Sequence, residues 1–366
     1  MLALAAAAPP GFAQELKTSG FASLVIGRSS GSCQPNALAS RYDSSCTRAI
    51  VDWSHGGVVT SDWEADVETR AGVQFDWQLT PQWSATTQLT ARTLKDQAFN
   101  LEWAYLSYAM SNEWKLQLGR KRIPLYYYSD FQDVGYAYNT IRPSPDVYGW
   151  DVVNYNGASL STAQNVGDWA LRAELFAGGE KSRKNPYTRL FTDEPPDVSW
   201  KSLGGLVVEM SHDWFTARVS YAQSNFSQRE RATGALLELY DGSTKAKQSF
   251  VGLALNGDWD VWQLRSEFGK AYRMEAVGYD ASYHLVTLSR VFGGITATVG
   301  NSAYREKTLY PNAYAISKVD TDSLALRYEL HQGGALKLQW DRIRNRGESL
   351  LGGNARVLSV AYDLVF

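Results

Sequence analysis

The chain has 366 residues, of which 44% are apolar, 20% charged and 13% aromatic, so it is neither disordered, collagen-like nor a disulfide scaffold. The 36 basic and 38 acidic residues give a formal charge of -2 without any basic block, which argues against nucleic acid as a partner. No apolar run beyond the N-terminus reaches the roughly 18 residues of a transmembrane helix. A membrane β-barrel remains possible, because its apolar residues alternate with polar ones.

The N-terminal segment resembles the end of a secretory signal peptide. Residues 2–8 form a short apolar core, and the small residues Gly11 and Ala13 stand where a signal peptidase cuts. We therefore expect residues 1–13 to be a signal-peptide remnant and residues 14–366 to form a single β-barrel domain. A basic segment at the start is missing, so a disordered apolar N-terminus is the alternative.

The chain contains two cysteines, Cys33 and Cys46, in a polar stretch rich in Ser, Asn and Asp. A secreted protein reaches an oxidising compartment, where a disulfide closing this short loop is the default. Two free buried thiols are the alternative. Two cysteines without histidines at zinc spacing do not make a metal site.

Alternation of apolar and polar residues dominates the chain, and helical periodicity is nearly absent. The clearest run covers residues 64–79, in which Val73, Phe75 and Trp77 share an apolar face and Arg70, Gln74 and Asp76 share the other. Similar runs lie near residues 168–175, 215–221, 323–331 and 336–341. Long strands with one uniformly apolar side are typical of a barrel standing in lipid.

The connections between these runs alternate in length. Seven very short turns are predicted near residues 80–82, 111–113, 165–167, 212–213, 256–258, 292–294 and 332–334. Eight longer connections are predicted near residues 29–63, 95–98, 124–152, 180–199, 227–245, 274–278, 308–319 and 346–353. Fifteen connections imply an all-β, sixteen-stranded antiparallel transmembrane β-barrel with short periplasmic turns and long outer loops.

Tryptophans gather beside the short turns, among them Trp77, Trp83, Trp114, Trp169 and Trp214. Trp favours a bilayer interface because its ring is apolar while its N–H stays hydrated. We expect these residues to form the periplasmic belt of the barrel, although packing at strand ends is the alternative explanation.

The last segment, LSVAYDLVF over residues 358–366, alternates up to a terminal Phe366 with Tyr362 four residues earlier. This motif resembles the assembly signal of Gram-negative outer-membrane barrels, and SGFASLVIG over residues 19–27 resembles the first strand of general porins. The resemblance implies a homotrimeric general porin, surrounded by outer-membrane lipid and lipopolysaccharide. It also implies that the third outer loop folds inward and narrows the channel.

The third predicted outer loop, residues 124–152, carries Asp130, Asp133 and Asp146, which could face the pore. In general porins an arginine cluster on early strands faces the acidic loop, and alternation sends Arg70 and Arg92 to the lumen here. We expect these two arginines to face Asp130 or Asp133 across the constriction and to favour anions. A solvated surface loop is the alternative for residues 124–152.

Further cations could join or replace this pair. Arg120 and Arg122 follow Leu116 and Leu118 in a pattern that turns them outward, unless a bulge resets the register. Additional lumen-side arginines are predicted at Arg172, Arg218, Arg265 and Arg327. The alternative for every lumen arginine is pairing with a nearby glutamate, which keeps the interior hydrated.

Motifs for catalysis or cofactor binding are absent from the sequence. The four histidines lack metal spacing, and no nucleophile elbow, Walker loop or dinucleotide-binding glycine run is present. We therefore expect no enzyme, no cofactor and no metal site. The predicted function is an outer-membrane channel for small hydrophilic solutes or ions. A substrate-specific porin for an anion or a sugar, and a soluble β-rich carbohydrate-binding protein, are the alternatives.

Overall fold

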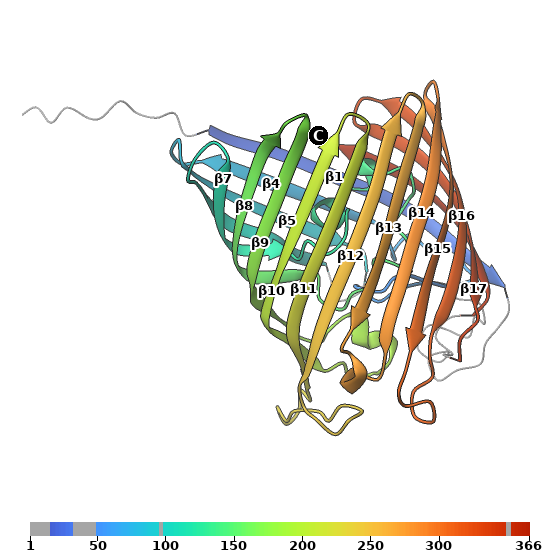
Figure 1. Cartoon of the computed structure of the whole chain (residues 1–366). Helices are drawn as coiled ribbons and strands as arrows, with labels where there is room; N and C mark the ends of the chain where they lie inside the picture. The colour runs from blue at the N-terminus through green and yellow to red at the C-terminus, as the bar shows by residue number, and fades with distance from the viewer. Residues whose placement is uncertain (1–14, 32–48, 95–97, 349–352) are drawn as a thin grey trace, which may run out of the picture.

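The computed structural model describes residues 15–31, 49–94, 98–348 and 353–366, and within them sixteen antiparallel strands close into a barrel (Figure 1). The barrel strands are β1 (Glu15–Gly31), β4 (Arg70–Gln78), β5 (Trp83–Arg92), β6 (Phe99–Ala109), β7 (Trp114–Arg122), β8 (Asn154–Val166), β9 (Trp169–Ser182), β10 (Asp197–His212), β11 (Phe215–Arg229), β12 (Ala246–Trp259), β13 (Trp262–Tyr272), β14 (Asp280–Phe292), β15 (Ile295–Lys307), β16 (Lys318–His331), β17 (Gly334–Asn345) and β18 (Ala355–Val365). Each strand pairs with its neighbour in sequence, and β1 pairs with β18 to close the ring.

Short and long connections alternate around the ring, so the predicted strand number and rhythm are confirmed. The short turns gather at the upper end of Figure 1 and the longer loops at the lower end. Two 3-10 helices, η3 (Tyr187–Leu190) and η4 (Glu275–Val277), lie in the longer loops. The predicted signal-peptide remnant (residues 1–13) and both predicted disulfide partners, Cys33 and Cys46, lie outside the described residues and stay predictions.

The outward face of the barrel is apolar, as the alternation predicts. Leu324 and Val219 are about half exposed, whereas the preceding residues Ser323 and Arg218 point inward. An aromatic girdle lies beside the short turns, and its exposed members are Trp77, Trp83, Trp114, Trp169, Trp214, Trp259, Phe292, Tyr328 and Phe366. This band matches the interfacial belt predicted from the tryptophan positions.

The apolar outer face leads to a prediction about charge. We expect Leu324→Arg to destabilise the barrel by roughly 2–4 kcal/mol, because a cation near the bilayer midplane loses its hydration. Thr287→Arg is the matched control, since Thr287 faces the lumen at a similar height. It pairs with Gly300, which pairs in turn with Ser323, the residue before Leu324. The measurement is the yield of heat-modifiable, folded barrel. Equal yields for the two variants would contradict the assignment of faces.

The strand predicted over residues 64–79 is shorter in the structure. β4 begins at Arg70, and the preceding residues turn away from the ladder. The reason is local: the Thr69 hydroxyl bonds both the N–H and the carbonyl of Val25, replacing the backbone partner that a longer strand would supply. The departure places Glu68 inside the barrel, where it is buried.

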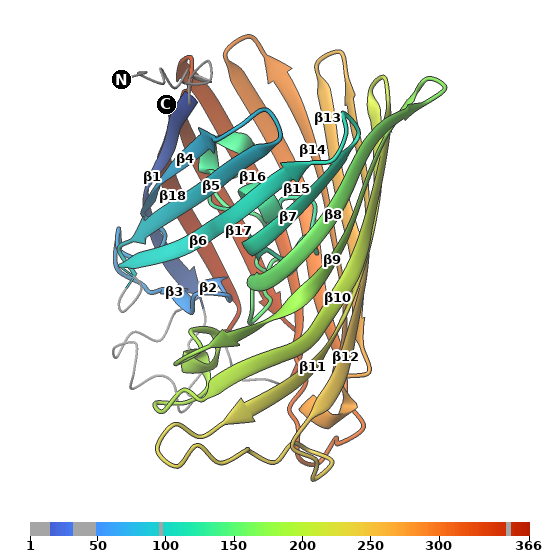
Figure 2. The same cartoon turned by 90° about the vertical axis from the view of Figure 1, so that its left-hand side faces the viewer.

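The first long connection also contains an element that periodicity did not predict. A two-stranded hairpin, β2 (Ala49–Asp52) and β3 (Gly57–Val59), lies inside the outer-loop end of the barrel. Ala49, Val51 and Val59 pack against Ala355 and Val357 of β18. The hairpin therefore fills the lumen beside the β1–β18 seam (Figure 2).

Residues 123–153, the connection between β7 and β8, fold into the lumen and are called the inner loop below (Figure 2). They contain two short 3-10 helices, η1 (Ser129–Phe131) and η2 (Gly135–Ala137). No helix among the described residues is long and apolar enough to cross a membrane. Apolar residues of the inner loop, including Leu125, Tyr126 and Val147, form the main core with the β8–β14 wall.

Candidate functional site: the inner loop and the lumen

The inner loop meets the β4–β7 wall at Asp133. Its carboxylate forms ion pairs with Arg92 and Arg122, and its backbone carbonyl accepts a hydrogen bond from Arg70 Nε at 2.8 Å. Burial opposes ionisation, but the three guanidinium groups hold the pKa of Asp133 well below its usual range. Arg70 and Arg92 thus contact Asp133 directly, whereas the sequence predicted that they face it across the constriction.

Arg120 and Arg122 occupy different environments. The β6–β7 ladder ends at the pair Ala104–Arg120, and β6 carries a register shift near Glu102. Beyond that point Arg120 bonds Glu180 at 2.8 Å, whereas Arg122 turns inward to Glu102 at 3.1 Å and to Asp133. The inward position of Arg122 follows from this local separation of the strands, which strict alternation did not predict.

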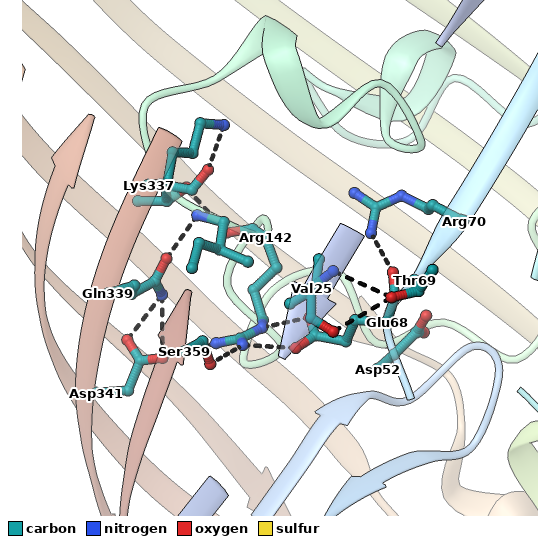
Figure 3. A network of polar contacts seen from close by, with 12 residues as sticks. Val25, Asp52, Glu68, Thr69, Arg70, Arg142, Lys337, Gln339, Asp341 and Ser359 are labelled. Atoms are coloured by element: carbon teal, nitrogen blue, oxygen red, sulfur yellow. Dashed lines mark hydrogen bonds and ion pairs between the residues drawn. The ribbon is translucent and has the colours of Figure 1, made fainter. Parts of the chain in front are cut away.

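A second cluster fixes the inner loop beside the β1–β18 seam through Arg142. Its guanidinium bonds both carboxylate oxygens of Glu68 at 2.5 and 2.6 Å and reaches Asp341 at 2.8 Å. It also donates to the Ser359 hydroxyl at 2.6 Å, as Figure 3 shows. Because Arg142, Glu68 and Asp341 are all buried, this triad is a strong local constraint on the loop.

A third contact involves Lys337 of β17, whose side chain is fully buried. Its ammonium donates to the carbonyls of Gly135 and Thr140 at 2.6 and 2.9 Å and lies 2.8 Å from a carboxylate oxygen of Asp363. Ser23 donates to the other oxygen of Asp363 at 2.5 Å. The loop, β17, β18 and β1 therefore meet at one point.

The approach at Gly135 leaves no space for a side chain, since a Cβ atom there would overlap Asp363 Oδ1 and the Ser23 hydroxyl. We expect Gly135→Ala to displace the loop from β17 and to raise the channel's open-state current noise, because the Lys337 contacts lengthen. The matched control is Gly294→Ala in the β14–β15 turn, where the nearest neighbour of a Cβ atom would lie 3.6 Å away. Unchanged noise in planar-bilayer recordings of Gly135→Ala would contradict the assigned docking.

Further polar contacts spread around the lumen. Arg327 donates to the carbonyl of Tyr136 at 2.7 Å, Asn139 donates to Gln263 at 2.6 Å, and the Ile141 N–H donates to Gln339 at 2.6 Å. Hydrogen bonds or ion pairs join the inner loop to β4, β5, β7, β11 and β13–β18. The loop is therefore attached across most of the barrel's circumference.

The other two predicted loop acids lie elsewhere. Asp130 is exposed on η1, and no ion pair within 4 Å joins it to any described residue. Asp146 is buried against the wall, where it accepts a hydrogen bond from Ser302 at 2.7 Å. Of the seven residues predicted for the constriction, the structure brings together Arg70, Arg92, Arg122 and Asp133.

The remaining lumen space is a chamber of about 720 Å³. The inner loop and the hairpin region bound it on one side, and the lumen faces of β12–β17 bound it on the other. Its lining extends from outer-loop residues such as Tyr240 and Tyr314 to Arg265 and Arg327, which lie toward the short-turn end. The path that a solute could follow thus runs beside β12–β17, away from the Arg70–Arg92 cluster.

Several residues of this arrangement are not singled out by the sequence. Nothing in the sequence of the inner loop, which is rich in tyrosine and aspartate, distinguishes Arg142 as a site residue. For Lys337 the alternation predicts that the side chain faces the lumen, but it does not predict its partners. Glu68 lies in the run of residues 64–79 in register with the polar face of Arg70 and Gln74, but in the structure that strand begins only after it. Among the described residues, no group of three or more His, Cys, Asp or Glu side chains could hold a metal ion.

Comparison with known proteins gives similarity in structure only. No protein-family model and no curated protein matches the chain. The outer membrane channel DcaP of Acinetobacter baumannii is similar with a TM-score of 0.61 at 10% identity, covering 96% of this chain and 97% of that one. OmpF of Salmonella typhi, solved in complex with daunomycin, gives a TM-score of 0.61 at 12% identity, covering 96% of this chain and 97% of that one.

An anion-selective porin from Comamonas acidovorans gives a TM-score of 0.59 at 15% identity, covering 96% of this chain and 100% of that one. The chain therefore has the fold of the porin barrels of Gram-negative outer membranes. At these identities the likeness concerns the sixteen-stranded closed barrel as a whole.

Proposed function

We propose that the protein is a passive diffusion channel for small hydrophilic solutes in the outer membrane of a Gram-negative bacterium. The observation that carries this proposal is a closed barrel with an apolar outer face, whose lumen is narrowed but not filled by an inward-folded loop. Similar solved barrels are described as an outer membrane channel and as a porin, which supports the same function.

Reconstitution in a planar lipid bilayer tests the proposal. We expect stepwise increases of current on insertion, together with a gel mobility in SDS that changes on boiling. Folded, heat-modifiable protein that inserts without conducting would contradict a channel and would leave a structural role for the barrel. Protein recovered only in the soluble fraction, with unchanged mobility, would favour the carbohydrate-binding alternative.

We also propose a homotrimer, since one similar structure is described as a trimer form of an outer membrane protein. Conductance that rises in groups of three equal steps per insertion, and a boiling-sensitive species of three times the monomer mass, are the expected results.

A substrate-specific porin is the second candidate, favoured by the many tyrosines that line the chamber.

A further inference from the structure

The outer half of the chamber is lined by tyrosines from four different outer loops and one strand. The rings of Tyr279 and Tyr314 stack with centroids 5.2 Å apart, and Tyr240 meets Tyr314 edge-on at 5.5 Å. Tyr187 and Tyr304 line the same space. These five partly exposed side chains are called the tyrosine box below; they present ring faces and edges to any solute that enters.

A carboxylate lies within the tyrosine box. Glu306, near the end of β15, accepts hydrogen bonds from the Tyr304 hydroxyl at 3.0 Å and from the Ser317 N–H at 2.6 Å. It also interacts with the Tyr314 hydroxyl. Glu306 is buried, and within the described parts of the chain no basic side chain forms an ion pair with it.

The charges that line the chamber are unbalanced. Each of its three arginines already has an acidic partner: Arg142 has Glu68 and Asp341, Arg265 has Asp258 at 2.7 Å, and Arg327 has Glu329 at 2.9 Å. Three lining carboxylates, those of Asp146, Asp151 and Glu306, have no cationic partner among the described residues.

The environment of Asp151 on the inner loop agrees with this imbalance. Burial raises the pKa of Asp151 to about 7, since only hydrogen-bonding groups and no cation oppose the effect. Burial likewise raises the pKa of Asp146, despite its hydrogen bond from Ser302. A carboxylate held in low-dielectric surroundings without a counter-charge is stabilised by any cation that enters beside it.

We propose that the chamber binds organic ammonium ions, with Glu306 and Asp151 supplying the opposite charge and the tyrosine box supplying the aromatic faces. This proposal rests on the proposed channel function and names the solute class of that channel. It replaces the anion preference expected from Arg70 and Arg92, because Arg92 is paired with Asp133, Arg70 donates to the backbone carbonyl of Asp133, and neither arginine lines the chamber.

The chemistry of the lining favours this ligand over others. An alkylammonium group gains cation–π attraction from ring faces and Coulomb attraction from a carboxylate, and it sheds its weakly held water easily. A bare alkali ion would forgo the aromatic contribution, and an anion would meet only arginines that already have acidic partners. The chamber volume of about 720 Å³ accommodates a small organic molecule.

Single-channel recording in a planar bilayer tests the proposal, with choline chloride as the probe in a potassium chloride solution at a pH above the raised pKa of Asp151, where its carboxylate is ionised. We expect a cation-preferring reversal potential and reversible block of the current by millimolar choline. In Glu306→Gln and Asp151→Asn, the choline concentration for half-block should rise about tenfold, the scale of a desolvated cation–π and charge contact. Tyr314→Leu should weaken block by choline more than it changes the potassium-to-chloride preference.

Glu275→Gln is the matched control, since Glu275 is an exposed carboxylate on the β13–β14 loop that does not line the chamber. Choline should block the Glu275→Gln channel at the same concentration as the unaltered channel. Equal choline block in Glu306→Gln and the unaltered protein, an anion-preferring reversal potential, or block by glucose in place of choline would each overturn the proposal. Absence of any conductance from folded protein would instead contradict the channel function itself.

Discussion

Asp133→Ala should enlarge the channel's conductance and shift its selectivity toward chloride. In the structure Asp133 is the one loop carboxylate that Arg92 and Arg122 share, while Arg70 bonds its backbone carbonyl. Without this carboxylate, the ion pair of Arg122 with Glu102 would be the one that remains to the three guanidinium groups among the described residues. Their mutual repulsion and their exposure to lumen water should push the loop away from the β4–β7 wall.

Single-channel conductance and the reversal potential in a potassium chloride gradient measure this effect. Asp130→Ala is the matched control, because Asp130 lies on the same loop, is exposed and has no ion pair within the described residues. We expect Asp130→Ala to change neither quantity appreciably. If Asp133→Ala and Asp130→Ala behave alike, the arginine cluster does not position the loop.

Arg142→Met should destabilise the docked loop by roughly 3–5 kcal/mol, the usual effect of removing one member of a buried ion pair. Methionine fills much of the arginine stem but leaves Glu68 and Asp341 buried without a cation. The measurement is the urea midpoint of the detergent-folded barrel, together with the open-state current noise.

The triple variant Arg142→Met, Glu68→Gln and Asp341→Asn separates charge from shape. It removes the uncompensated charges, so most of the stability lost in Arg142→Met should return. If the triple variant is no more stable than Arg142→Met, the contribution of Arg142 lies in its hydrogen bond to Ser359 or in its packing. That result would contradict the ion-pair explanation.

Much of the barrel could be predicted from the sequence because period-two alternation and turn residues are local signals. The outward positions of Leu324 and Trp77 and the sixteen-strand rhythm follow from them. The inward position of Arg122 could not be predicted in this way, because it depends on where β6 and β7 separate. Alternation therefore predicts whether a side chain faces the lumen or the lipid only as far as its strand stays paired with both neighbours.

The contacts of the lumen were less accessible to such reasoning. Alternation sends Arg70, Arg92 and Lys337 inward, but it carries no information about partners far away in sequence. Lys337 bonds a loop carbonyl 202 residues away, and Arg142 bonds Ser359 across 217 residues. Arg70 and Arg92 therefore do lie on the lumen side, but they bond Asp133 directly, and the open chamber runs beside other strands.

The point where Ser23, Asp363, Lys337 and Gly135 meet has a consequence for how the chain acquires its structure. Ser23 and Asp363 are separated by 340 residues, so their contact closes a very large loop of unfolded chain. Contacts of such high sequence separation form late, because their entropy cost precedes any gain. The inner loop is held near this seam by the contacts of Lys337 with Gly135 and of Arg142 with Ser359. The narrowed lumen should therefore be among the last features to form. Barrels with a transiently open lumen should precede it.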